Sequence, residues 1–170
     1  MPEGGLPMGD RPVALVSACL LGIACRYDGG AQPCPEVLAR MDRYQFVPIC
    51  PEQLGGLPTP RTPAERRGDR VVAADGTDVT TQFRHGAEQA CRLADLYGAE
   101  LAVLKSRSPS CGRGEIYDGS FSGRRVPGRG VTAEALEALG VRVINESEFA
   151  ELEREAGFPG PDEQLKGECE

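Results

Sequence analysis

The stretch RPVALVSAC, residues 11–19, is a continuous apolar run of strand length that ends in serine, alanine and cysteine. Short apolar runs of this kind are typical of strands that are buried on both faces of a sheet. Three similar runs follow it: YQFVPIC at residues 44–50, ELAVLK at residues 100–105 and VRVINE at residues 141–146. The sequence therefore predicts a strand at each of these four places.

Segments with helical spacing of apolar residues separate these strands. The clearest is residues 80–97, which Gly98 follows in a position suited to end a helix. Residues 34–43 and residues 132–139 have the same character. Because strands that alternate with helices form parallel sheets with crossover helices, we expect an α/β fold with a mostly parallel, Rossmann-like sheet. Ligands of such sheets bind at the C-terminal ends of the strands, so we expect the functional site there.

Proline and glycine mark the connections between these elements. The segment GGLPTPRTPAE, residues 55–65, has the composition of an extended loop. The segment RVVAADGTDVT, residues 70–80, resembles a hairpin that turns at Asp75 and Gly76. A long glycine-rich loop follows the strand at residues 100–105.

The length of 170 residues suits one compact domain with a substantial core. We assign residues 12–150 to this domain and residues 1–11 to a flexible N-terminus. Residues 151–170 are polar and acidic, which predicts a loose C-terminal tail. No apolar stretch approaches the roughly 20 residues that span a bilayer, and the first residues lack the pattern of a secretory signal. We therefore expect a cytoplasmic protein that does not contact membranes.

The formal net charge of -7 is unevenly distributed. Residues 134–170 contain 11 acidic and 3 basic residues, whereas residues 101–130 contain 6 basic and 2 acidic residues. A mildly cationic middle is compatible with an anionic small molecule or a nucleotide near the site. It is too weak to predict strong binding of duplex nucleic acid, which requires a larger basic excess.

The number and spacing of the cysteines argue against two kinds of structure. The chain has seven cysteines: Cys19, Cys25, Cys34, Cys50, Cys91, Cys111 and Cys169. An odd number without a signal peptide argues against a secreted disulfide framework. No pair has CxxC spacing and His85 is the only histidine, which argues against a zinc ribbon or finger.

Three of these cysteines share one placement. Cys19, Cys50 and Cys111 each lie at or just beyond the C-terminal end of a predicted strand. Three thiols at one sheet edge suit a soft metal or an iron–sulfur cluster. A cubane cluster normally takes four cysteines, so three would leave one iron open to act as a Lewis acid. Considered alone, the residues also fit another interpretation, in which the cysteines are ordinary small residues near turns.

Three long motifs carry a resemblance that favours the cluster. They are VSACLLGIACRYDGG at residues 16–30, CPEQLGGLPTPR at residues 50–61 and LKSRSPSCGRGEIYDGSFSG at residues 104–123. In this order they resemble a bacterial family long catalogued as a domain of unknown function. Some members of that family are iron–sulfur-dependent thiouracil desulfidases. The resemblance extends from about Val13 to Glu146.

The resemblance implies roles for individual residues. Cys19, Cys50 and Cys111 would ligate a [4Fe-4S] cluster whose fourth iron binds the sulfur of a thiocarbonyl substrate. Glu52 and Ser108 would be catalytic, handling protons and orienting the substrate. Cations near these motifs can offset thiolate and substrate charge, so we also expect substrate-binding roles for Arg61 and Lys105.

The function implied is hydrolytic removal of sulfur from a thiolated pyrimidine such as 2-thiouracil, which gives uracil and sulfide. The expected partner is thus a small thiolated base, and the sequence sets no oligomeric state. Three alternatives stay open at this point. The first is a desulfidase of another thiolated nucleobase, nucleotide or RNA component. The second is a non-catalytic iron–sulfur or sulfur-carrier module, and the third is a small-molecule-binding domain whose thiols take zinc.

Overall fold

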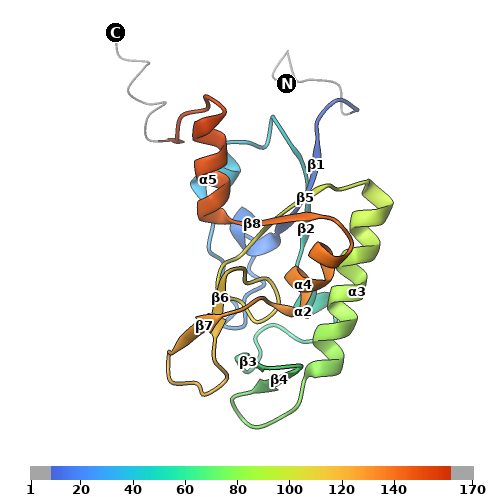
Figure 1. The fold of residues 1–170 in the computed structure, drawn as a ribbon, viewed down its shortest axis with the longest axis vertical. Helices are drawn as coiled ribbons and strands as arrows, with labels where there is room; N and C mark the ends of the chain where they lie inside the picture. The colour runs from blue at the N-terminus through green and yellow to red at the C-terminus, as the bar shows by residue number, and fades with distance from the viewer. Residues whose placement is uncertain (1–8, 162–170) are drawn as a thin grey trace.

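The structure, a computed structural model, describes residues 9–161. Fourteen elements follow one another along these residues (Figure 1). They are β1 (Val13–Ser17), the 3-10 helix η1 (Ala18–Leu21), α1 (Pro35–Leu38), β2 (Gln45–Ile49), α2 (Pro51–Leu54), β3 (Ala64–Arg67), β4 (Arg70–Ala73), α3 (Thr80–Tyr97), β5 (Leu101–Leu104), β6 (Glu115–Tyr117), β7 (Arg125–Pro127), α4 (Val131–Ala138), β8 (Arg142–Asn145) and α5 (Glu146–Glu155).

The central sheet has four strands in the order β2-β1-β5-β8, and all neighbouring pairs are parallel. All four predicted strands are in it. The register pairs Ser17 with Ile49 and Val16 with Val103, so β1 lies between β2 and β5. This architecture confirms a single α/β domain with a mostly parallel sheet. The more specific Rossmann-like assignment stays a prediction.

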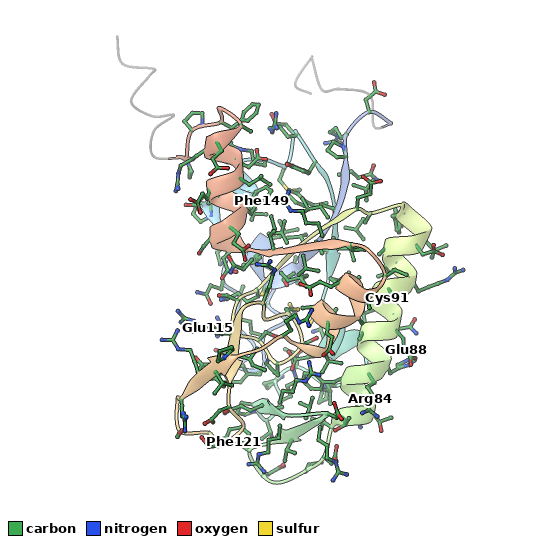
Figure 2. The ribbon with its side chains drawn as sticks, in the orientation of Figure 1. Arg84, Glu88, Cys91, Glu115, Phe121 and Phe149 are labelled. Carbon is green, nitrogen blue, oxygen red and sulfur yellow. The ribbon has the colours of Figure 1, made fainter. Side chains whose placement is uncertain are left out.

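The alternation of side chains along the strands buries both faces of the sheet. Leu15 and Leu104 pack in the cluster that also contains buried residues of α3 and α4. Val16 and Val103 belong to the opposite cluster, which Phe149 of α5 covers. Figure 2 shows Phe149 directed from α5 toward the sheet. Burial on both faces explains why these strands are continuous apolar runs in the sequence.

The helix predicted over residues 80–97 is confirmed, because α3 has these bounds. Gly98 ends it in the left-handed region at φ 63°, and its N–H group donates to the carbonyl groups of Ala94 and Asp95. The helix predicted over residues 34–43 is much shorter, since α1 ends at Leu38. The chain leaves the helix there and brings Arg40 into a buried ion pair with α5.

Two hairpins lie beyond the ends of the sheet strands, in the lower part of Figure 1. In the first, β3 pairs with β4, so part of the loop predicted over residues 55–65 is a strand. The predicted turn at Asp75 and Gly76 is present, and Val72 bridges to Asp78 beyond it. The strand β4 nevertheless pairs with β3, and the bridge to Asp78 is only an addition to this pairing. The second hairpin joins β6 to β7 and was not expected.

The C-terminal helix α5 continues to Glu155, past residue 150 where we expected the folded domain to end. Glu153 is only 3 % exposed. Its carboxylate accepts hydrogen bonds from Arg40 Nε at 3.0 Å, Arg43 Nε at 3.1 Å and the Tyr44 hydroxyl at 2.7 Å. Burial and the bond to Glu153 raise the pKa of Tyr44 to about 12. These contacts fasten α5 to the segment between α1 and β2.

Residues 1–8 of the predicted N-terminal segment and residues 162–170 of the predicted tail, with Cys169, lie outside the described residues. Their flexibility stays a prediction. Across residues 9–161, no helix combines the length and the apolar character that a membrane crossing demands.

Helix α2 packs unusually close to α3 through two glycines. A Cβ atom on Gly86 would lie 1.9 Å from the carbonyl oxygen of Pro51, and one on Gly55 would lie 2.0 Å from that of Gln82. No side chain fits at either position without moving the backbone. This close approach fixes the short helix that follows Cys50.

Gly86→Ala is therefore expected to lower the free energy of unfolding by about 1–3 kcal/mol, because overpacking outweighs the usual helical preference for alanine over glycine. Urea denaturation of the wild type and the variant measures this difference. Glu88→Ala, on the exposed side of the same helix (Figure 2), should change it by less than about 0.5 kcal/mol. Stabilisation by Gly86→Ala would contradict the packing described.

Candidate active site

A cavity of about 310 Å³ opens at the C-terminal edge of the sheet. The connections that follow β1, β2 and β5 form most of its wall. All seven residues that the sequence analysis singled out line it: Cys19, Cys50, Glu52, Arg61, Lys105, Ser108 and Cys111. Residues separated by up to 92 positions in the chain thus share one cavity, as the parallel sheet requires.

The three thiols reach the cavity from three strand ends. Cys19 lies in η1 directly after β1, Cys50 lies between β2 and α2, and Cys111 lies in the loop after β5. Cys19 and Cys111 are buried, and Cys50 is half-buried. Each thiol interacts electrostatically with the other two, because a negative charge on one raises the pKa of another. The structure therefore brings together the three cysteines selected from the sequence.

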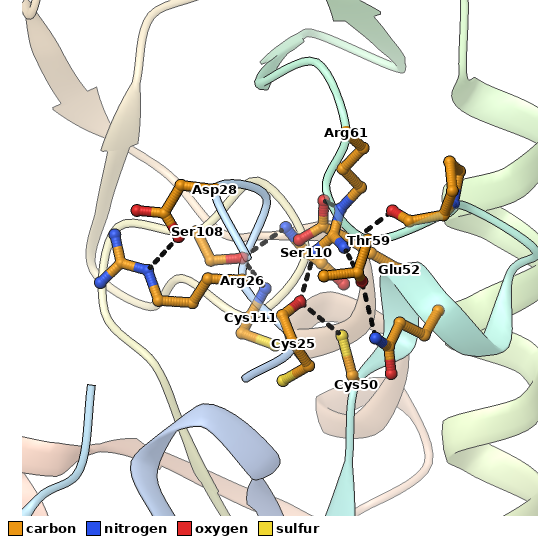
Figure 3. Close-up of polar contacts among 12 residues, drawn as sticks. Cys25, Arg26, Asp28, Cys50, Glu52, Thr59, Arg61, Ser108, Ser110 and Cys111 are labelled. Carbon is orange, nitrogen blue, oxygen red and sulfur yellow. Dashed lines mark hydrogen bonds and ion pairs between the residues drawn. The ribbon is translucent and has the colours of Figure 1, made fainter. Parts of the chain in front are cut away.

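A fourth thiol, Cys25, also lines the cavity, although the sequence analysis did not count it as a ligand. It is buried, and its thiol forms hydrogen bonds with the thiols of Cys19 and Cys50. Its carbonyl oxygen accepts a hydrogen bond from Cys50 Sγ at 3.7 Å (Figure 3). The sequence indicated Cys25 only through its place in the motif at residues 16–30. It was not selected because, unlike the other three cysteines, it does not follow the end of a predicted strand.

These contacts give the thiols different proton affinities. The hydrogen bond from Cys25 lowers the pKa of Cys19. The pKa of Cys50 is raised, first by its hydrogen bond with Cys25 and then by burial. Burial raises the pKa of Cys111 to about 12. In the metal-free protein at neutral pH, Cys19 is therefore the most readily ionised of the three.

Glu52 lies in the first turn of α2 and is held by Arg61. Arg61 Nε donates to Glu52 Oε1 at 3.2 Å, and the two side chains are 5 % and 18 % exposed respectively. The Glu52 carboxylate is near the thiols, since its charge contributes to the raised pKa of Cys111. An ionised carboxylate in this position can exchange protons with a molecule in the cavity.

Ser108 organises the turn that carries Cys111. Its hydroxyl oxygen accepts hydrogen bonds from the backbone N–H groups of Ser110 at 3.1 Å and Cys111 at 3.0 Å. Its carbonyl oxygen accepts one from the N–H group of Gly112 at 2.8 Å. Because the hydroxyl acts as acceptor in both bonds, its hydrogen can be donated to a group in the cavity.

Lys105 is held at the cavity wall by a residue that the sequence analysis missed. Its Nζ donates to Glu146 Oε1 at 2.9 Å, and its backbone N–H group donates to Ser17 Oγ at 2.8 Å. Glu146 also accepts from the backbone and the hydroxyl of Ser106. Burial alone would raise the pKa of Glu146, but the bonds from Lys105 and Ser106 lower it below its ordinary value. Nothing local in the sequence marks Glu146, because its partners are 40 positions away.

The donor set has the chemistry of an iron–sulfur site, because its three members are thiols. Within residues 9–161, no three His, Cys, Asp or Glu side chains converge closely enough to hold one metal ion. A cubane cluster is wider than an ion, so its thiolate ligands stand farther apart. Three buried or half-buried thiols around a cavity of about 310 Å³ are soft donors of the kind that hold such clusters. The residues present therefore fit this group.

A second cavity, of about 340 Å³, adjoins the first and shares Tyr27, Glu52 and Tyr117 with it. Phe121, at the tip of the β6–β7 hairpin, completes its aromatic lining. Among residues 9–161, no Lys or Arg side chain lines this second cavity, and its charged residues are Glu52 and Glu65. Apart from these two carboxylates, it extends the site with a largely apolar wall.

The unequal pKa values predict unequal reactivity in the metal-free protein. Cys19 and Cys111 are almost equally buried, but more of Cys19 is ionised at pH 8, because its pKa is lowered whereas that of Cys111 is about 12. We expect iodoacetamide to modify Cys19 at least about tenfold faster, since the thiolate is the nucleophile. Peptide mass spectrometry under anaerobic, reducing conditions measures the two rates. Equal rates would contradict these ionisation states.

Three comparisons with known proteins show the family to which the chain belongs. A family model described as 2-thiouracil desulfurase matches residues 14–148. The uncharacterized protein YbbK of Bacillus subtilis (strain 168) is 42% identical over 148 residues, which are 81% of this chain and 98% of YbbK. The solved structure of the [4Fe-4S]-dependent thiouracil desulfidase TudS superposes with a TM-score of 0.77 and 42% identity, covering 86% of this chain and 99% of that chain. The chain belongs to the 2-thiouracil desulfurase family.

Proposed function

We propose that this protein is an iron–sulfur-dependent desulfidase that converts a thiolated pyrimidine such as 2-thiouracil to uracil and sulfide. The observation that supports this most directly is the shared cavity: Cys19, Cys50 and Cys111 enter it from three strand ends, beside Glu52 and Ser108. Membership of the family and the likeness to TudS support the same activity.

Cys19, Cys50 and Cys111 are the proposed ligands of a [4Fe-4S] cluster. When bound, this group supplies an iron with an open position, a soft Lewis acid suited to a thiocarbonyl sulfur. Thiols bind such a group as thiolates, so its binding displaces the protons that Cys50 and Cys111 hold at neutral pH.

Glu52 is the proposed acid–base group. The overall reaction adds one water to the C=S carbon and releases hydrogen sulfide, so it requires proton transfer and no net oxidation or reduction. The carboxylate of Glu52 can take a proton from the attacking water and return it to a ring nitrogen of the substrate. Its bond to Arg61 through Oε1 leaves Oε2 for this exchange.

Ser108 is the proposed orienting group. Two backbone N–H groups fix its hydroxyl oxygen, which leaves the hydroxyl hydrogen for donation to a group in the cavity that Ser108 and Cys111 line. A hydrogen bond from Ser108 to the substrate would hold the ring in one orientation. Direct substrate binding by Arg61 and Lys105 stays a prediction, because the hydrogen bonds of these two side chains are to atoms of the protein itself.

The second cavity favours a related candidate function, in which the thiolated base carries a substituent, as in a nucleotide or RNA component. Tyr27 and Tyr117 border both cavities, so a substituent on the ring can pass from the first cavity into the second. Assays with 2-thiouracil and with 2-thiouridine side by side distinguish the two candidates.

The proposed ligand set is tested by anaerobic reconstitution with iron and sulfide, followed by incubation with 2-thiouracil. We expect Cys111→Ala to lose most of the bound iron and all turnover, because one of three ligands is missing. Cys91→Ala is the matched control, since Cys91 lies on α3 and does not line the cavity. Loss of the thiocarbonyl absorbance measures turnover. A Cys111→Ala protein with full iron content and turnover would overturn the ligand assignment.

The proposed catalytic role of Glu52 separates an enzyme from a sulfur-carrier module. Glu52→Gln keeps the shape of the side chain but removes its basicity, so we expect the iron content to be retained and kcat to fall by about 10²- to 10⁴-fold. Glu88→Gln, on the exposed surface of α3, is the control for the loss of one carboxylate. Unchanged kcat in Glu52→Gln would contradict the role of Glu52, and an assembled cluster without turnover in the wild type would favour the carrier. Zinc in place of iron in anaerobically purified protein would favour a non-catalytic binding domain.

A further inference from the structure

Arg61 is buried in the wall of the cavity, although it belongs to the proline- and glycine-rich loop between α2 and β3. Its side chain is 5 % exposed. The three guanidinium nitrogens all donate to atoms of the protein. Nε donates to Glu52 Oε1 at 3.2 Å, Nη2 to the Cys25 carbonyl oxygen at 3.0 Å, and Nη1 to Thr59 Oγ1 at 3.0 Å and the Pro58 carbonyl oxygen at 3.2 Å (Figure 3).

These bonds join the loop of Arg61 to two other segments of the chain. Glu52 is in the first turn of α2, Cys25 is in the connection after β1, and Thr59 is in the loop of Arg61 itself. The backbone reinforces the junction, because the Arg61 N–H group donates to the Tyr27 carbonyl oxygen at 2.8 Å. Arg61 therefore sets the distance between the Glu52 carboxylate and the segment that carries Cys25.

The Cys25 carbonyl group links this junction to a proposed cluster ligand. It accepts both from Arg61 and from Cys50 Sγ, the latter at 3.7 Å. Once Cys50 is a thiolate it has no hydrogen to donate, and Arg61 is then the side chain that holds this carbonyl group. The position of the Cys25 segment in the loaded protein would thus depend on Arg61.

The geometry also explains why the residue is an arginine. A guanidinium group is planar and directs its N–H groups in fixed directions, so one side chain can hold a carboxylate and a carbonyl oxygen at a set angle. A lysine ammonium would retain the charge but not this arrangement. Within residues 9–161, Glu52 Oε2 accepts no hydrogen bond, so this second oxygen is available to a molecule in the cavity that Glu52 lines.

We propose that Arg61 is a positioning residue, which is anchored by the Cys25 carbonyl group, acts on the reaction through Glu52 and does not bind the substrate. The proposal rests on the function proposed above. It differs from the expectation of direct substrate binding in what should change when Arg61 is removed. A substrate contact affects KM, whereas misplacement of Glu52 affects kcat.

The first test is a double-mutant cycle with Arg61→Ala, Glu52→Gln and the combined variant, each reconstituted anaerobically and assayed with 2-thiouracil. We expect Arg61→Ala to lower kcat by about 10- to 100-fold and to change KM by less than about threefold. In the Glu52→Gln background, Arg61→Ala should lower kcat by less than about twofold, because the carboxylate through which Arg61 acts is already absent. Arg61→Lys should recover only part of kcat, and Arg92→Ala on exposed α3 should match the wild type.

Two outcomes of the cycle would overturn the proposal. A raised KM with unchanged kcat in Arg61→Ala would assign Arg61 to substrate binding. An equal loss of kcat in both backgrounds would show an effect that does not pass through Glu52. If Arg61→Ala does not fold, as thermal unfolding would reveal, Arg61→Lys takes its place in the cycle with the same criteria.

The second test does not depend on turnover. Crystal structures of the metal-free wild type and Arg61→Ala should show the Glu52 carboxylate in one orientation in the former and displaced in the latter. An unchanged Glu52 orientation in Arg61→Ala would overturn the proposal even for an active enzyme. Conversely, absence of turnover in the wild type with displacement of Glu52 in the variant would reject the proposed function and retain the positioning role.

Discussion

The parallel pairing of β1 with β2 on one side and β5 on the other is the constraint on which the site depends. The register aligns Ser17 with Ile49 and Val16 with Val103, so the three strands end at nearly the same level. Cys50 is the residue after Ile49, and Cys19 follows Ser17 by two positions. A shift in register would separate the thiols along the sheet edge, and the apolar faces of the strands oppose such a shift because both are buried.

Polar contacts of individual side chains then hold the loops beyond the strand ends in place. Ser17 accepts a hydrogen bond from the backbone of Lys105, which joins the ends of β1 and β5. The hydroxyl groups of Ser110 and Thr132 are 2.8 Å apart and join the loop of Cys111 to α4. Ser110 and Thr132 are fully buried, so an unpaired hydroxyl at either position would be costly. These bonds hold the loop that carries Cys111 against β1 and α4.

The parts of the structure that depend on local pattern could be predicted from the sequence. The bounds of α3 follow from apolar spacing and Gly98, and the placement of Cys19, Cys50 and Cys111 at one edge follows from the alternation of strands and helices. Most of the parts that were not predicted depend on distant partners. Residues 151–155 have the composition of a tail, yet they belong to a helix because Glu153 pairs with two arginines more than 100 positions away. The role of Glu146 was missed for the same reason, because its partners Lys105 and Ser106 lie far away in the chain. The strand β3 has a local partner, β4, and was missed because the proline- and glycine-rich sequence that leads into it has the composition of a loop.

The sequence also could not predict whether a charged residue contacts the protein or a ligand. The sequence placed Arg61 near the site and gave it a positive charge to offer a substrate, which is all that composition and motif can indicate. The structure adds the four hydrogen bonds that direct its guanidinium group to Glu52, Cys25, Pro58 and Thr59. An arginine that forms ion pairs within the protein and an arginine that binds a ligand are identical in the sequence. They differ only in the atoms that surround them.

The central claim is that three thiols from three strand ends hold a cluster in which one iron is left for the substrate. Mössbauer spectroscopy of protein reconstituted anaerobically with iron-57, recorded with and without 2-thiouracil, tests it most directly. The account predicts that about one quarter of the iron signal changes when 2-thiouracil is added, because three of the four iron atoms keep their cysteine ligands. A reconstituted cluster whose spectrum is identical with and without 2-thiouracil would contradict it.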